Sequence, residues 1–246
     1  MTSAKKEIQR KINLNKDYTH IWSIDDFNNL SRISVQKAFS ILEKEQFIKR
    51  IKRGFYYRPI KTVLGINSFD KHQFAIAKIR NKGSFYCYSG INGYNMLGFT
   101  TQMSNTITLA SDYKCRNFDN VVYLYRKKVI DGGNAERIVL DLINDIKIIP
   151  DTTVENSILH IKDLINNKKV NLISLIKTAI DKKIPIETPR AKAVVGAIGE
   201  EFNADKKLLE KLKQTINPTT KIFLNVGNSL PKAENWNIVE EKGENK

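Results

Sequence analysis

The side chains best suited to catalysis are few in this sequence, and none lies in a catalytic spacing. The three histidines, His20, His72 and His160, are far apart and match no zinc-ligand pattern. The chain has no phosphate-binding glycine loop, no nucleophile elbow and no HExxH motif. Asp141 and Asp145 share one face of an expected helix, but the residues that follow are mainly aliphatic and offer no base. We therefore expect no catalytic residues, no metal and no cofactor.

The binding of polyanions is far better represented than catalysis. The chain carries 41 Lys and Arg against 26 Asp and Glu, a formal net charge of +15. A charge of this sign and size favours nucleic acid as the partner. The excess is +8 in residues 1–61, +6 in residues 62–128 and +1 in residues 129–246. We therefore predict an anion-binding first part and a second part with a different role.

The first 61 residues contain a pattern of elements that could present these cations to DNA. Apolar spacing predicts two short helices before residue 31 and a longer helix from Ser34, its N-cap, to Gln46. In residues 47–59, FIKRIKRGFYYRP, apolar and basic residues alternate around Gly54, which predicts a β-hairpin. The order helix, helix, turn, helix and hairpin is that of a winged helix-turn-helix domain.

Nine side chains of this domain are expected to contact DNA. A helix fits the major groove, where Gln36 can pair with adenine and Lys37 can reach guanine or phosphate. Basic residues of the hairpin would neutralise phosphates or enter the minor groove. The predicted DNA-binding residues are Ser34, Gln36, Lys37, Ser40, Lys49, Arg50, Lys52, Arg53 and Arg58. A basic hairpin can equally be a solvated edge strand, and winged helices also serve as protein-binding modules.

The rest of the chain is expected to form a second domain, residues 62–246, so the fold class is α+β. Residues 61–68 read as a linker, and the last fifteen residues as a frayed tail. Arg126, Lys127 and Lys128 are expected to extend the DNA-facing surface. The first part of this domain, 62–130, is expected to be mixed α/β, with strands at 106–110 and 121–125. The second part, 131–246, is expected to be mainly helical, with Asp151 and Asp205 as N-caps. Its predicted helices are 135–146, 153–166, 171–182, 189–201 and 205–216.

Cysteine usage and hydropathy predict a cytoplasmic protein. The two cysteines, Cys87 and Cys115, form no CxxC motif and no disulfide framework, which is typical of a reducing compartment. No run of about 18 apolar residues is present, so we expect no transmembrane helix and no membrane partner. The basic start of the chain is not followed by an apolar stretch, so a signal peptide is not expected.

Three segments resemble those of AbiE-type (type IV) abortive-infection antitoxins. They are SVQKAFSILEKEQFIKRIKRGFYYRP (34–59), GSFYCYSGINGYNMLGFTTQMSNTITLASD (83–112) and TPRAKAVVGAIGEEF (188–202). The resemblance covers most of residues 20–216. It implies a transcriptional autorepressor whose N-terminal winged helix binds inverted repeats in its own promoter. It also implies a C-terminal domain that counteracts a nucleotidyltransferase toxin, typically encoded next to it, and it attributes no catalytic residues to the antitoxin.

Two other functions stay open at this point. The first is a DNA-binding or protein-interaction regulator without a toxin partner. The second is a nuclease-like enzyme, because the strands at 106–110 and 121–125 would suit an α/β nuclease fold. A catalytic Asp followed by Glu-x-Lys is not found in that stretch. The residues that would face a toxin are not predicted.

Overall fold

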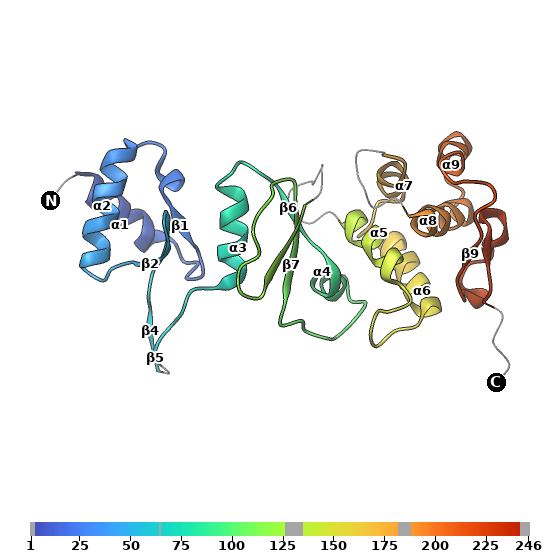
Figure 1. Ribbon diagram of the computed structural model, residues 1–246, viewed down its shortest axis with the longest axis horizontal. Coiled ribbons are helices and arrows are strands. Elements are labelled where there is room, and N and C mark those ends of the chain that lie inside the picture. Colours follow the sequence, from blue (N-terminus) through green and yellow to red (C-terminus); the bar gives the residue numbers. More distant parts are fainter. Residues whose placement is uncertain (1–2, 64, 126–134, 182–187, 242–246) are drawn as a thin grey trace. The chain divides into compact units, whose positions relative to one another are not determined.

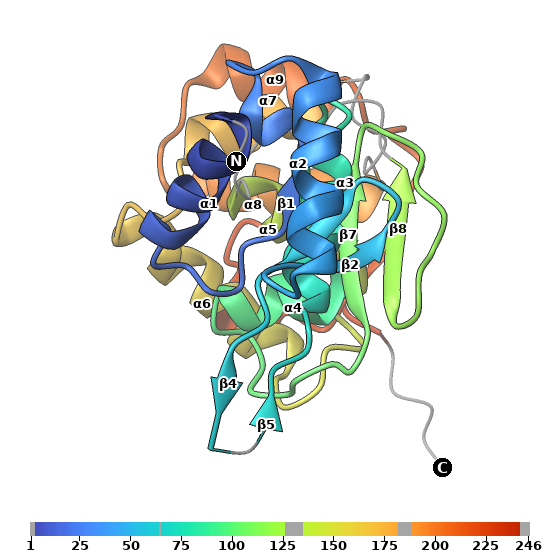
Figure 2. The same ribbon diagram turned by 90° about the vertical axis from the view of Figure 1, so that its left-hand side faces the viewer.

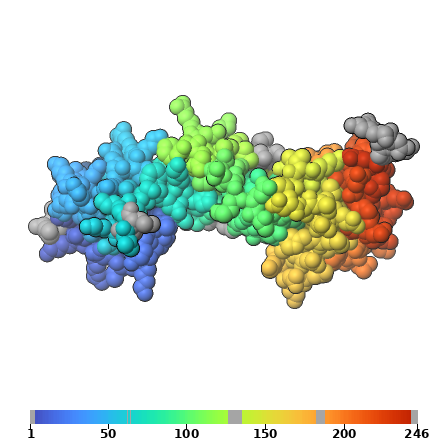
Figure 3. Space-filling model, turned by 90° about the horizontal axis from the view of Figure 1, so that it is seen from below, coloured from blue at the N-terminus to red at the C-terminus, as the bar shows by residue number. Residues whose placement is uncertain are grey.

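The computed structural model describes residues 3–63, 65–125, 135–181 and 188–241 and shows an α+β protein. The chain divides into two compact units, Met1–Ser84 (unit 1) and Phe85–Lys246 (unit 2). Figure 1 traces both units along the chain, and Figure 3 shows them with their atoms as spheres. Unit 1 extends past residue 61, where the sequence places a functional boundary; that functional division stays a prediction.

Unit 1 packs two helices against a small antiparallel sheet. Helices α1 (Ser3–Leu14) and α2 (Arg32–Lys44) contact each other (Figure 2). The sheet has the order β1-β3-β2, so β2 is an edge strand. Its strands are β1 (Trp22–Ser23), β2 (Lys49–Lys52) and β3 (Phe55–Tyr57). The buried side chains between helices and sheet are Ile8, Ile12, Trp22, Phe27, Val35, Ala38, Phe39, Leu42, Ile48 and Tyr56.

The helix predicted just before residue 31 is only partly present. Trp22 and Ser23 form β1, and a short 3-10 helix, η1 (Ile24–Phe27), follows. The Asp26 carboxylate accepts a hydrogen bond from the Ser23 N–H at 2.5 Å, as in a capping box. The helical turn thus begins with a capping box, whereas Trp22 and Ser23 pair with the edge of β3 and belong to the sheet.

Helix α2 begins two residues earlier than predicted. Ser31 is its N-cap, and the Ser31 Oγ accepts a hydrogen bond from the Ser34 N–H at 3.2 Å. The prediction of Ser34 as the cap is therefore wrong. The reason is local: the Leu30 N–H bonds to the Phe27 carbonyl, and this turn already brings Ser31 to the start of the helix.

The hairpin predicted around Gly54 is confirmed, and a second one follows it. Strands β2 and β3 pair antiparallel, and Gly54 lies in the turn with φ 85°. The segment 61–68, expected as a linker, contains the short antiparallel strands β4 (Lys61–Thr62) and β5 (Gly65–Ile66). Helix α3 (Lys71–Arg80) then begins after Asp70, whose carboxylate caps the Gln73 N–H at 3.0 Å.

Unit 2 begins with a three-stranded mixed sheet. Strands β6 (Tyr86–Tyr88), β7 (Ile107–Ser111) and β8 (Val121–Tyr125) lie in the order β6-β7-β8. The pair β6–β7 is antiparallel and the pair β7–β8 is parallel. Helix α4 (Gly90–Met96) connects β6 to β7. Strands were therefore correctly predicted at 106–110 and 121–125.

Five helices follow among the described residues, and their starts show which capping predictions hold. They are α5 (Ala135–Asp145), α6 (Val154–Asn166), α7 (Leu172–Ile180), α8 (Pro189–Glu201) and α9 (Lys206–Lys213). Asp205 caps α9 as predicted. Asp151 does not cap α6, because Thr153 takes that position. Asp151 instead has φ 65°, and its carboxylate accepts hydrogen bonds from the Thr100 and Thr101 hydroxyls at 3.1 and 3.3 Å.

The C-terminal segment is packed up to residue 241, so the expectation of a frayed tail is wrong there. Strands β9 (Ile222–Phe223) and β10 (Ile238–Val239) pair in parallel, and 3-10 helices η2 (Gly227–Ser229) and η3 (Glu234–Trp236) lie between them. Trp236 is buried beside Gly196 of α8. Apolar residues spaced irregularly in this segment gave no periodic signal. None of the described helices has both the length and the apolar character needed to cross a membrane.

Candidate nucleic-acid interface

Helix α2 presents a polar face to solvent because its apolar stripe fixes its rotation in unit 1. The stripe consists of Val35, Ala38, Phe39 and Leu42, all buried. Gln36, Lys37 and Ser40 lie on the opposite side and are exposed, as predicted from helical spacing. Ser34 is half-buried, and its Oγ accepts a hydrogen bond from the Ser31 hydroxyl at 2.8 Å. Ser34 therefore belongs to the start of the helix as much as to its outer face.

The hairpin places its predicted cations on an edge strand and a turn. Lys49, Arg50 and Lys52 are exposed on β2, and Arg53 is exposed in the turn that leads to β3. Arg58 differs, because it is half-buried and its guanidinium lies 5.5 Å from the centroid of the Phe47 ring. The structure therefore gathers four exposed cations on the hairpin and uses Arg58 partly in packing.

The helix face and the hairpin are fixed by the same core. The Phe39 ring on α2 lies 4.7 Å from the Tyr56 ring on β3, centroid to centroid, and Tyr56 is opposite Arg50 in the ladder. Burial raises the pKa of the Tyr56 hydroxyl, an effect that the nearby positive charge of Arg50 partly offsets. Tyr56 is thus a neutral packing residue.

Acidic side chains do little to offset the charge of this surface. Residues 32–58 contain eight Lys and Arg but only Glu43 and Glu45 as acids. Glu45 is ion-paired at 2.5 Å with Lys5 of α1, whose side chain is buried. Two further exposed cations, Arg32 and Lys44, lie on the same outer face of α2. Arg32 was missed because the helix was expected to begin after it; the i, i+4 spacing 32, 36, 40, 44 was the signal.

We name this surface the basic face of unit 1. It comprises Arg32, Gln36, Lys37, Ser40, Lys44, Lys49, Arg50, Lys52 and Arg53. Arg126, Lys127 and Lys128, expected to add to it, lie outside the described residues.

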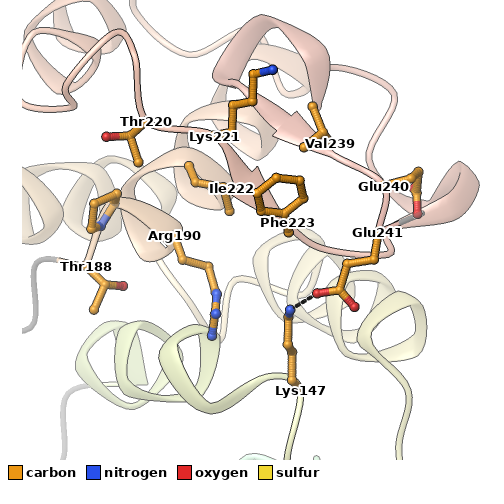
Figure 4. Close-up of a pocket in the computed structure, with 11 residues that line it drawn as sticks. Lys147, Thr188, Arg190, Thr220, Lys221, Ile222, Phe223, Val239, Glu240 and Glu241 are labelled. Carbon is orange, nitrogen blue, oxygen red and sulfur yellow. Dashed lines mark hydrogen bonds and ion pairs between the residues drawn. The ribbon is translucent and has the colours of Figure 1, made fainter. Parts of the chain in front are cut away.

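Unit 2 contains an open groove of about 1070 Å³ next to the β9–β10 pair (Figure 4). Four of the charged side chains that line it have partners within the fold. Lys147 forms an ion pair with Glu241, and the Arg190 guanidinium donates to the Asn144 carbonyl at 2.7 Å. The Glu240 carboxylate accepts hydrogen bonds from two backbone N–H groups at 3.0 and 3.1 Å. These contacts join helices to strands around the groove and give the four side chains a structural role.

The paired carboxylates of α5 also have structural partners. Asp141 accepts a hydrogen bond from the Ser89 hydroxyl at 3.0 Å, and Asp145 accepts one from the Tyr94 hydroxyl at 2.6 Å. Burial, and then the bond to Asp145, raises the pKa of Tyr94, so this hydroxyl stays a donor. These bonds anchor α4 to α5. Within the described ranges, no group of three or more His, Cys, Asp and Glu side chains could hold a metal ion.

Comparison with known proteins places most of the chain in one group. The model of a protein family described as a family of unknown function, DUF6088, matches residues 7–173. The match includes the whole basic face of unit 1 and the β6-β7-β8 sheet of unit 2. No curated protein matches the chain.

Proposed function

The chain belongs to the DUF6088 family, and we propose that it is a DNA-binding repressor of its own operon and the antitoxin of a type IV toxin–antitoxin pair. The repressor role rests on unit 1, read as a winged helix-turn-helix domain with α2 as recognition helix and β2–β3 as wing. The antitoxin role rests on the resemblance to AbiE-type antitoxins. The protein would then act in the cytoplasm, without catalysis of its own.

The observation that carries the DNA-binding proposal is the basic face of unit 1. Its helix stripe and hairpin come from one compact core, and seven of its nine residues are Lys or Arg. A rigid helix with exposed polar side chains suits the major groove, and cations on the adjoining strand suit the flanking phosphates. If the lysines of the edge strand served only to prevent aggregation, the adjoining outer face of α2 would not need cations as well.

The expected binding is strongly salt-dependent. If about six cations contact phosphates, the logarithm of the affinity falls with that of the salt concentration with a slope of about −5. Affinity should then drop roughly 10³-fold between 50 and 200 mM salt. Removing three of these cations should reduce the slope by about 2.7.

The test compares two variants with the same loss of charge. The first replaces Lys37, Arg50 and Arg53 by alanine. The second replaces Lys206, Lys207 and Lys211, which are exposed on α9 of unit 2. Binding to a duplex containing the promoter's inverted repeats is measured by fluorescence anisotropy against a scrambled duplex. We expect the first variant to lose specific binding and the second to keep it. Equal binding by both variants would show that the basic face of unit 1 does not read DNA.

The antitoxin role has its own test. The adjacent gene, expected to encode a nucleotidyltransferase, is expressed in a host with and without this chain. Growth should stop with the toxin alone and recover when the full chain is present. Recovery should persist with the triple alanine variant of the basic face, because neutralisation is assigned to the second domain. If the product of the neighbouring gene is harmless, the antitoxin role is refuted, and the function that remains is that of a DNA-binding regulator without a toxin partner.

A further inference from the structure

One end of the β6-β7-β8 sheet carries three exposed aromatic side chains. Phe85, just before β6, is 46% exposed; Tyr113, just after β7, is 39% exposed; and Tyr125, the last residue of β8, is 46% exposed. The ladder pairs Tyr86 with Ser111 and Ser111 with Tyr125, so the three strand ends are neighbours. We call this group, together with Lys114, the aromatic end of the sheet. Exposed aromatic residues on neighbouring strand ends suit a binding surface, since folding alone favours their burial.

Local hydrogen bonds hold the chain at this end in place. The Phe85 N–H donates to the Asp112 carboxylate at 3.1 Å, and the Tyr113 N–H donates to the Ser111 hydroxyl at 3.1 Å. The first bond joins the start of β6 to the loop after β7. It also gives the Asp112 carboxylate a partner within the fold.

The rings stand next to positive charge. The Lys114 Nζ lies 5.1 Å from the centroid of the Tyr125 ring, and Arg116 is exposed in the same loop. Residues 85–128 contain five Lys and Arg against two Asp. Three of the five, residues 126–128, follow Tyr125 directly in the sequence, although their positions lie outside the described residues. The sequence of residues 85–128 therefore has a net positive charge, and the described part of it presents exposed aromatic rings beside Lys114.

We propose that the aromatic end of the sheet binds single-stranded nucleic acid. Unpaired bases stack on Phe85, Tyr113 and Tyr125, and the ammonium of Lys114 pairs with phosphate. Because every base has a stacking face, this binding has little sequence preference. A duplex hides its base faces, so it does not compete well for this site. A protein partner could also use exposed rings, but the Lys114 ammonium beside the Tyr125 ring and the excess of Lys and Arg in the sequence of residues 85–128 favour a polyanion.

The test uses the full chain and fluorescein-labelled oligo(dT) and oligo(U) of about 20 nucleotides, a length that covers one binding platform. Fluorescence anisotropy gives the dissociation constants at low salt. Phe85→Ala and Tyr125→Ala should each weaken binding about tenfold. Tyr125→Phe should keep it, because the stacking ring remains. The matched control is Phe223→Ala, which removes a ring that is 53% exposed on β9, two residues after Lys221.

The outcomes separate this site from the basic face of unit 1. The variant with Lys37, Arg50 and Arg53 replaced by alanine should keep most of its oligo(dT) binding while losing duplex binding. The proposal is overturned if the wild-type chain does not bind either oligonucleotide, or if Phe85→Ala and Tyr125→Ala bind as tightly as Phe223→Ala. It is also overturned if these two variants bind oligonucleotide normally but fail to form the complex with the toxin, because the aromatic end would then be a protein-binding surface. Thermal unfolding of each variant excludes loss of the fold as the cause.

Discussion

Replacing Gly196 by alanine should destabilise unit 2, although alanine is the better helix former. In a solvent-exposed helix, this exchange stabilises by about 0.5–1 kcal/mol. In α8, a Cβ at position 196 would lie 2.3 Å from Cζ3 and 2.4 Å from Cε3 of Trp236. No real Cβ makes such a contact, so the indole would have to move. Trp236 is only 3% exposed and has little room in which to do so.

The size of the effect follows from what holds the indole. The Trp236 Nε1–H donates to the Glu200 carboxylate at 2.9 Å, and the Lys213 ammonium lies 5.5 Å from the ring centroid. Overpacking at such a site costs about 1–3 kcal/mol, and complete loss of a buried tryptophan costs about 3–5 kcal/mol. After subtraction of the gain in helix propensity, we expect Gly196→Ala to lower the free energy of unfolding by about 2 kcal/mol.

Urea unfolding followed by circular dichroism measures this loss, and two further variants test its cause. In the Trp236→Leu background the clash is relieved, so Gly196→Ala should be neutral or stabilise by up to about 1 kcal/mol. Gly199→Ala in the same helix should cost less than Gly196→Ala, because its Cβ would meet the flexible tips of Leu209 and Ile176, at 2.8 and 3.1 Å, rather than a rigid ring. A stabilising Gly196→Ala in the wild-type chain, or an equal cost in both backgrounds, would refute the packing argument.

Three further substitutions probe polar contacts inside each unit. Glu45→Ala should destabilise unit 1 by about 3 kcal/mol, because it leaves the buried ammonium of Lys5 unpaired. Lys5→Met removes that ammonium and should cost less. A larger loss for Lys5→Met in thermal unfolding would contradict this. Tyr94→Phe removes the hydrogen bond to Asp145 and should cost about 2 kcal/mol at pH 7. The raised pKa of Tyr94 means that its stabilisation is full below the unfolded value of 10.0 and is lost as pH rises above it. The difference between wild type and variant in chemical unfolding should therefore shrink by about 1 kcal/mol between pH 10 and 11. A constant difference would be inconsistent with burial of this hydroxyl. Asp151→Ala should destabilise unit 2 by about 2 kcal/mol, because it removes the acceptor of the Thr100 and Thr101 hydroxyls. Asp151→Asn should cost less. Equal melting temperatures for the two variants would count against this role.

Local sequence signals predicted the helices and the hairpin well. Thr188 and Pro189 mark the start of α8, and the predicted span 189–201 agrees with the structure because cap and first turn are adjacent in sequence. Gly54 likewise marks the β2–β3 turn. Strand β1 was not predicted, because Trp22 and Ser23 become a strand only by pairing with β3, more than thirty residues later.

In the candidate site too, some features follow from local sequence patterns and others depend on contacts between distant residues. The exposure of Gln36 and Lys37 follows from helical periodicity, which is local and was read correctly. The contact of Arg58 with the Phe47 ring depends on how the hairpin folds back and leaves no trace in residue spacing. The aromatic end of the sheet was missed for the same reason, because strands far apart in sequence bring its rings together. The DNA-binding role of the basic face stays a prediction.

The burial of α8 determines where the chain can be shortened. All nine residues from Ala191 to Gly199 are buried, and α8 packs against α5, α7 and α9. The family match ends at residue 173, inside α7, whereas the apolar core of unit 2 continues to Ile238. A fragment cut at residue 173 would expose the apolar sides of α5 and α6 to water and would be expected to aggregate. Expression boundaries for unit 2 therefore belong after β10, and limited proteolysis of the intact chain should leave α8 among the last segments to be cleaved.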